Sequence, residues 1–93
     1  MRFRADIART LGDLLLDHLY TKAGGDGRSL VTLHPERAAC LLGGGPRASR
    51  AEVGVVRDML HVLATEKPRA YRVQPSAHAT GHFDIQPFRG DFP

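Results

Sequence analysis

The sequence predicts one small α+β domain, in which three helices and a short strand are followed by a C-terminal β-hairpin. Three observations support this fold class. Apolar residues recur every three or four positions near the N-terminus, a helix-start signal stands at residue 49, and apolar residues alternate with polar ones near the C-terminus. The 93 residues, 42% of them hydrophobic, suffice for one domain over 1–93 with a modest core.

The first helix is predicted over residues 4–22. Spacings of three and four place one apolar stripe on it, formed by Phe3, Ile7, Leu11, Leu14, Leu15 and Leu19. We expect this stripe to face the core. Leu16 and Tyr20 point partly away from it and form a second apolar side, which predicts a homodimer through the first helix. A glycine-rich run at 23–27 ends the helix, because glycine adopts the left-handed conformation of helix ends.

A short strand and a second helix are predicted next. The segment Arg28–Leu33 is rich in β-branched and apolar residues, which favours a strand. Pro35 suits the first position of a helix, where its missing N–H would be unpaired in any case. This helix is predicted over Pro35–Leu42, ending at the glycines of 43–45. Its expected buried residues are Ala38, Ala39, Leu41 and Leu42.

The third helix is predicted from Arg50 to Glu66. Ser49 stands three residues before Glu52, the spacing of a reciprocal capping box, and Pro68 bars continuation. Its expected buried side is Val53, Val56, Leu60 and Leu63. The alternating segments 70–74 and 82–86, joined by a loop bearing Pro, Ser and Gly, then predict a β-hairpin.

This order of elements resembles a winged helix-turn-helix DNA-binding domain, and the resemblance covers roughly residues 5–87. It rests on Arg28–Leu33 as first strand, Pro35–Leu42 and Ser49–Glu66 as helix-turn-helix, and Tyr71–Gln86 as the wing. The resemblance implies that the third helix reads DNA and that the hairpin pairs with the first strand. One departure is the turn at 43–48, which is longer and richer in glycine than usual.

The positive charge is concentrated around the third helix. The formal net charge of the chain is +3, and residues 46–72 hold six Lys or Arg against three Asp or Glu. Such a patch suits an anionic partner, with nucleic acid as the first candidate.

Candidate DNA-binding residues lie on the side of the third helix opposite its apolar face. This side carries Arg50, Gly54, Arg57 and His61, while Arg47 and Ser49 stand at the helix start. Gly54 costs about 1 kcal/mol of helix stability relative to alanine, and it would let the helix backbone approach a groove closely. The alternative interpretation is an ordinary solvated basic face with a tolerated glycine.

The hairpin offers further candidates for contacts with the DNA backbone or minor groove, namely Arg69, Arg72, His78 and Thr80. Arg72 could equally be a solvent-facing strand residue. No lysine or arginine lies between Val73 and Gln86. This absence weakens the prediction that the hairpin contacts DNA more than it weakens the same prediction for the third helix.

The sequence predicts no enzyme, no cofactor and no metal site. It holds no Cys-x-x-Cys or His-Glu-x-x-His motif, and its one cysteine, Cys40, permits no intrachain disulfide.

From the order of the elements and the basic face of the third helix, we expect a cytoplasmic protein that binds double-stranded DNA as a transcriptional regulator. The alternative is a winged-helix protein–protein interaction module of a transcription or replication assembly, favoured by Asp58, Asp84, Asp91 and the uncharged hairpin tip.

Overall fold

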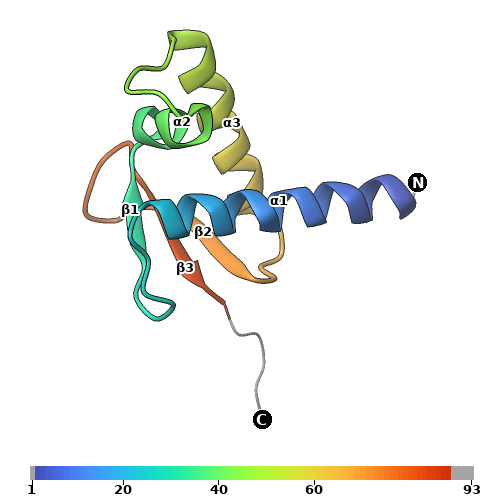
Figure 1. Ribbon diagram of the computed structural model, residues 1–93. Helices are drawn as coiled ribbons and strands as arrows, with labels where there is room; N and C mark the ends of the chain where they lie inside the picture. The colour runs from blue at the N-terminus through green and yellow to red at the C-terminus, as the bar shows by residue number, and fades with distance from the viewer. Residues whose placement is uncertain (1, 89–93) are drawn as a thin grey trace.

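The computed structural model describes the backbone of residues 2–88 and the side chains of residues 9–88. This part of the chain forms three helices and three strands, in the predicted order (Figure 1). The elements are α1 (Arg2–Lys22), β1 (Val31–Leu33), α2 (Pro35–Gly43), α3 (Arg50–Thr65), β2 (Tyr71–Pro75) and β3 (Phe83–Pro87).

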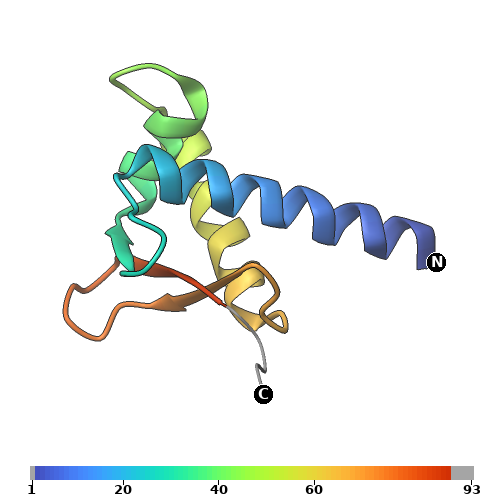
Figure 2. The ribbon, with the colours of Figure 1, turned by 60° about the horizontal axis from the view of Figure 1, so that its bottom comes forward.

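The three strands form one antiparallel sheet in the order β1-β3-β2, as the predicted pairing of the hairpin with the first strand requires. Ile85 of the central strand lies opposite Val31 on one side and Val73 on the other. Figure 2 shows the helices gathered on one side of this sheet. The core therefore lies between the helices and the sheet.

The core draws on both layers. Leu19 of α1, Leu33 of β1, Leu60 of α3 and Ile85 of β3 are almost completely buried. On α3 the predicted apolar face is confirmed, since Val56 is also buried and its neighbours on that face pack partly buried against the core. The other buried apolar residues of the described part of the chain are Leu16, Tyr20, Pro35, Ala38, Ala39, Val73 and Phe83.

The predicted orientation of α1 is wrong over most of the helix, although Leu19 of the expected core stripe is fully buried. Leu16 and Tyr20, assigned to a second side, are 4% and 2% exposed, whereas Leu11 and Leu14 of the expected core stripe are 60% and 62% exposed. Only the C-terminal half of the helix packs on the body of the domain, while its N-terminal half projects beyond it (Figures 1 and 2). The two N-terminal stripe residues, Phe3 and Ile7, lie outside the described side chains.

The close approach of α1 to α3 at Gly12 accounts for this orientation. A Cβ atom added at Gly12 would lie 3.0 Å from Cδ2 of Leu63, so this glycine faces α3. Residues four and seven positions further on share the same face of a helix, which turns Leu16 and Leu19 toward the core. Small size at position 12, rather than hydrophobicity, therefore marks the packed side.

The first strand is shorter than predicted, because residues 28 and 29 belong to a turn. The Asp26 carboxylate accepts hydrogen bonds from the backbone N–H groups of Arg28 and Ser29, at 2.8 and 2.7 Å. These two bonds, with that from Ser29 the stronger, hold the pKa of Asp26 below its usual value. The Tyr20 hydroxyl donates to the Ser29 carbonyl at 2.6 Å and fixes the turn against α1. Pairing with β3 starts only at Val31.

Candidate functional site

The start of α3 is fixed by the predicted capping box. The Ser49 hydroxyl accepts from the Glu52 N–H at 3.1 Å, and the Glu52 carboxylate accepts from the Ser49 N–H at 2.9 Å. The second bond chiefly lowers the pKa of Glu52 from its ordinary value. Because both side chains accept hydrogen bonds from backbone N–H groups at the helix start, α3 presents a well-defined first turn.

Replacing Ser49 by alanine is expected to destabilise the fold by about 1 kcal/mol, because the Glu52 N–H loses its partner. The Glu52 bond adds a pH dependence. Its lowered pKa means that its contribution is present at neutral pH and is lost as the pH falls through that pKa, below 4.5. Urea denaturation at neutral pH measures the first effect. An unchanged midpoint for Ser49→Ala would show that the cap does not stabilise the helix.

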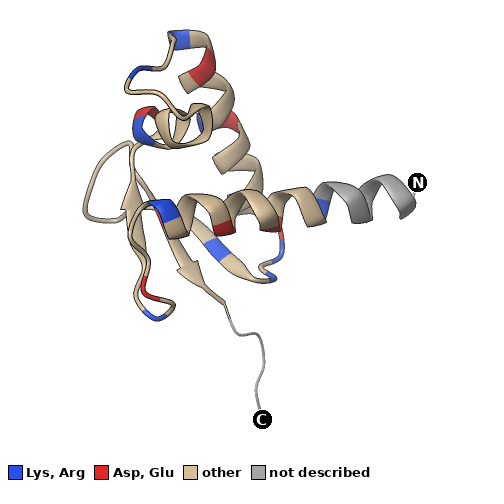
Figure 3. Cartoon of the chain, viewed as in Figure 1, with Lys and Arg blue, Asp and Glu red and all other residues tan. Residues whose placement is uncertain are grey.

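The outer face of α3 exposes two arginines on either side of a glycine. Arg50 and Arg57 are exposed and Gly54 is half-buried. A Cβ atom added at Gly54 would meet only Nη2 of Arg57, at 3.6 Å, which is ordinary contact. Packing within the described part of the chain therefore does not require glycine here. Arg47, also exposed, lies in the loop just before the helix, and Figure 3 shows basic residues at this end of α3.

His61 lies one helical turn after Arg57, where the outer face of α3 meets the hairpin. Its ring packs edge-on against the Phe83 ring, with centroids 4.8 Å apart and planes at 81°. Phe83 is buried at the start of β3, so His61 links the exposed face of α3 to the sheet. The predicted row of residues thus begins at the helix start and ends at the hairpin.

The loop between β2 and β3 is a compact turn that carries His78 and Thr80 at its exposed tip. The Ser76 N–H donates to the His82 carbonyl at 2.9 Å, and the Ser76 hydroxyl accepts from the His78 N–H at 3.3 Å. The His82 ring packs edge-on on that of His34, the N-cap of α2, with centroids 5.0 Å apart. The hairpin tip therefore lies beside the start of α2.

The other two predicted hairpin residues lie at its base. Arg69 forms an ion pair with Asp13 of α1, with Nε 3.3 Å from Oδ2, and Arg72 lies over the Phe88 ring, 5.2 Å from its centroid. The structure therefore does not bring Arg69 and Arg72 together with Arg47 and Arg50. The pair with Asp13 is largely solvated and is expected to contribute little to stability.

Asp84 differs from its expected place on the surface. It is 6% exposed, and its Oδ1 accepts a hydrogen bond from the Thr32 hydroxyl at 2.7 Å. Asp84 sits on the central strand, between Thr32 of β1 and Gln74 of β2, which explains why alternation alone did not reveal its burial. It is therefore not a surface charge for a protein partner. Asp58 is exposed, and Asp91 lies outside the described residues.

Within the described residues, no three His, Cys, Asp or Glu side chains gather as metal ligands would, and Cys40 is half-buried. No helix in that part of the chain is both long and apolar enough to cross a membrane. Comparisons of the chain with protein-family models, with curated proteins and with solved structures find no match.

Proposed function

We propose that the domain is a winged helix-turn-helix protein that binds double-stranded DNA, with α2 and α3 as the helix-turn-helix and the β2–β3 hairpin as the wing. The observation that carries this proposal is the exposed face of α3, where Arg50 and Arg57 flank Gly54. The three helices and the antiparallel sheet are compatible with such a fold. In helix-turn-helix proteins the N-terminal end of the second helix contacts base edges.

The chemistry of this face suits DNA. Arginine presents a planar fork of donors that can bind a guanine edge or a phosphate through two hydrogen bonds. Arg47 and Arg50 stand at the start of α3, where the backbone N–H groups also favour negative charge. Gly54 has no side chain to hold the helix away from a groove. His61, at the end of the same row, packs on Phe83 at the loop end of the hairpin.

Replacing Gly54 by alanine separates close approach from a tolerated glycine. Alanine favours the helix, so we expect the free energy of unfolding to rise by up to about 1 kcal/mol. The added methyl meets only the mobile end of Arg57 within the described structure, so no internal clash offsets this gain. DNA affinity is nevertheless expected to fall, because the methyl would stand between the helix backbone and the base edges. A variant that is more stable and binds DNA as tightly as the wild type would contradict close approach.

We further propose that the protein is a cytoplasmic transcriptional regulator. The experiment is retention of genomic fragments on the immobilised protein, followed by their sequencing. The proposal predicts enrichment of a short common sequence. Uniform retention would indicate binding without a sequence preference and would contradict a role in regulation at particular sites.

A second candidate function is a winged-helix protein-interaction module. The exposed loop tip favours it, because it carries His78 and Thr80, whereas a wing that binds DNA tightly would carry lysine or arginine there. This candidate predicts no retention of duplex DNA by the pure protein. The same retention experiment therefore distinguishes the two functions.

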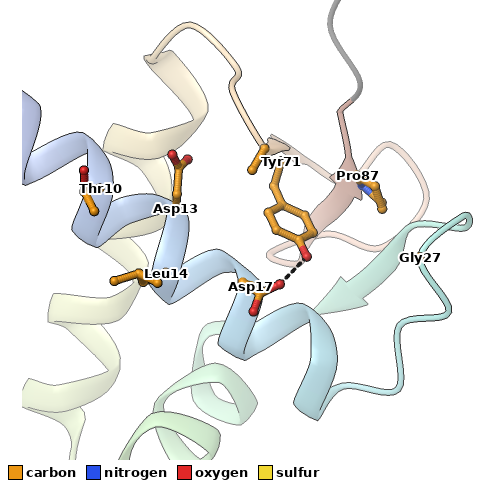
Figure 4. Close-up of a pocket in the computed structure, with 8 residues that line it drawn as sticks. Thr10, Asp13, Leu14, Asp17, Gly27, Tyr71 and Pro87 are labelled. Carbon is orange, nitrogen blue, oxygen red and sulfur yellow. Dashed lines mark hydrogen bonds between the residues drawn. The ribbon is translucent and has the colours of Figure 1, made fainter.

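We also propose that a second copy of the chain packs on the outward side of α1. Leu11 and Leu14 are 60% and 62% exposed on this helix. Leu14 lines a shallow hollow of about 410 Å³ together with Tyr71 and Pro87, shown in Figure 4. The Tyr71 hydroxyl donates to Asp17 at 2.6 Å, and burial together with this bond raises the pKa of Tyr71 to about 12. Tyr71 is therefore protonated at neutral pH and can keep this hydrogen bond beside the hollow.

Sedimentation tests the dimer. The wild type is expected to dimerise at micromolar concentration, and Leu11→Glu with Leu14→Glu to be monomeric, because a charge would be buried in the interface. Leu30→Glu, at a leucine that is 43% exposed in the turn before β1, is the matched control and should leave the dimer intact. A monomeric wild type would contradict this proposal without affecting that of DNA binding.

A further inference from the structure

A wide groove runs between α1, the end of α3 and strand β2. It encloses about 890 Å³ and is separate from the exposed arginines of α3. Leu16 of α1 and Val73 of β2, both nearly buried, line it together with the partly buried Leu63 of α3. Its volume falls in the range of pockets that bind small molecules, and its lining supplies an apolar surface for part of a ligand.

The lining also carries an excess of positive charge. Four cationic side chains line the groove against two carboxylates, those of Asp13 and Glu66. Asp13 is paired with Arg69. When this ion pair is set aside, one carboxylate, that of Glu66, remains against three cations, which are Arg9, Lys67 and Arg72. An anion in the groove would therefore meet a net attraction, and a cation a net repulsion.

We propose that this groove binds a small amphipathic anion, a carboxylate or sulfonate on an apolar body. The apolar body would lie against Leu16, Leu63 and Val73, and the acidic head would lie near Lys67. Burial of the apolar part supplies the affinity, whereas the cations select for the sign of the head. The proposal does not depend on what α3 binds, and the chain can hold such a ligand whether or not it binds DNA.

The test uses the fluorescence of 8-anilinonaphthalene-1-sulfonate added to the full chain, with displacement by two compounds that share one alkyl tail. Decanoate carries a carboxylate, and decyltrimethylammonium carries a positive charge. We expect the dye to bind the wild type with a Kd below about 1 mM, and decanoate to displace it at least about tenfold more effectively than the ammonium compound. This comparison requires no variant.

Two matched pairs of variants locate the site. The chain has two lysines, Lys22 and Lys67, both exposed, and only Lys67 lines the groove. Lys67→Glu is expected to weaken decanoate binding about tenfold, and Lys22→Glu to change it little, although both change the net charge equally. Val62 and Val55 are both exposed on α3, and only Val62 lines the groove. Val62→Asn should likewise weaken binding, and Val55→Asn should not.

Thermal unfolding of each variant confirms that it is folded before binding is measured. The proposal is overturned by failure of the dye to bind the folded wild type, by equal displacement with the two alkyl compounds, or by equal effects within both matched pairs. DNA affinity of the Val62 variant, which leaves the net charge unchanged, is measured without dye and reports on binding by α3. A failure of DNA binding is thus distinguishable from a failure of the groove.

Discussion

Replacing Gly25 by alanine is expected to destabilise the fold by about 3 kcal/mol, at the upper end of the cost of overpacking a well-filled site. A Cβ atom at this position would overlap the Tyr20 ring at Cε2, Cδ2 and Cζ. The ring cannot move aside cheaply, because Tyr20 is 2% exposed and its hydroxyl bonds the Ser29 carbonyl and the Gly27 N–H. The Gly25 N–H in turn donates to the Tyr20 carbonyl at 2.9 Å, which holds the backbone over the ring.

Gly45→Ala is the matched control. Gly45 also has an ordinary φ, and a Cβ atom there would meet only the Arg47 carbonyl oxygen, at 3.9 Å. We expect this change to alter the free energy of unfolding by less than about 0.5 kcal/mol. Urea denaturation of the two variants measures the difference. Equal stabilities would mean that the turn does not rest on the Tyr20 ring as described.

Replacing Arg50 by alanine is expected to cost about 1–3 kcal/mol of affinity for the preferred DNA site, and to relax the preference for that sequence. The physical reason is loss of a side chain that reaches a base edge from the first turn of α3. Replacing Arg57 has a different expected result. A phosphate contact carries no sequence information, so all duplexes should bind more weakly, and the slope of log affinity against log salt should fall by about one.

Arg28→Ala is the control for both variants, because Arg28 is exposed in the turn before β1, away from α3. Fluorescence anisotropy with preferred and scrambled duplexes gives all the affinities. An Arg50 variant that weakens both duplexes equally would contradict base contact. Variants of Arg50 and Arg57 that match the Arg28 control would contradict the proposed role of this face.

The ends of the helices were readable in the sequence because they depend on local chemistry. Ser49 and Glu52 form the predicted capping box. Gly24 and Gly44 take positive φ values of 90° and 72° where α1 and α2 end. Such signals act within a few residues and need no knowledge of tertiary neighbours. The pairing of the hairpin with the first strand, by contrast, was expected only from the resemblance to winged helix-turn-helix domains, and the sheet order agrees with it.

The orientation of α1 was not readable, because apolar residues occur on more than one of its sides. The packed side is selected by Gly12, which approaches Leu63, a partner far away in the sequence. Asp84 was misplaced for a similar reason, since its burial depends on the strands on either side. The turn at residues 28 and 29 replaced a predicted strand because the Asp26 carboxylate captures its N–H groups.

The candidate site was partly predictable. Helical spacing placed Arg50, Gly54 and Arg57 on one face of α3, and the structure keeps the two arginines exposed. Sequence proximity to the hairpin did not reveal that Arg69 lies against Asp13 at its base. The groove between α1, α3 and β2 was also beyond the sequence, because its lining residues come together only through packing.

The most direct test of the central proposal is the affinity of the wild type for duplex DNA as a function of salt. Proteins that neutralise phosphates release counterions, so affinity must fall as salt rises from about 50 to about 200 mM, linearly in log affinity against log salt. With Arg47, Arg50 and Arg57 at the interface, we expect a slope of about −2 to −3 per protein chain. Absence of duplex binding at the lower salt concentration, or an affinity that does not change with salt, would contradict recognition of DNA by α3.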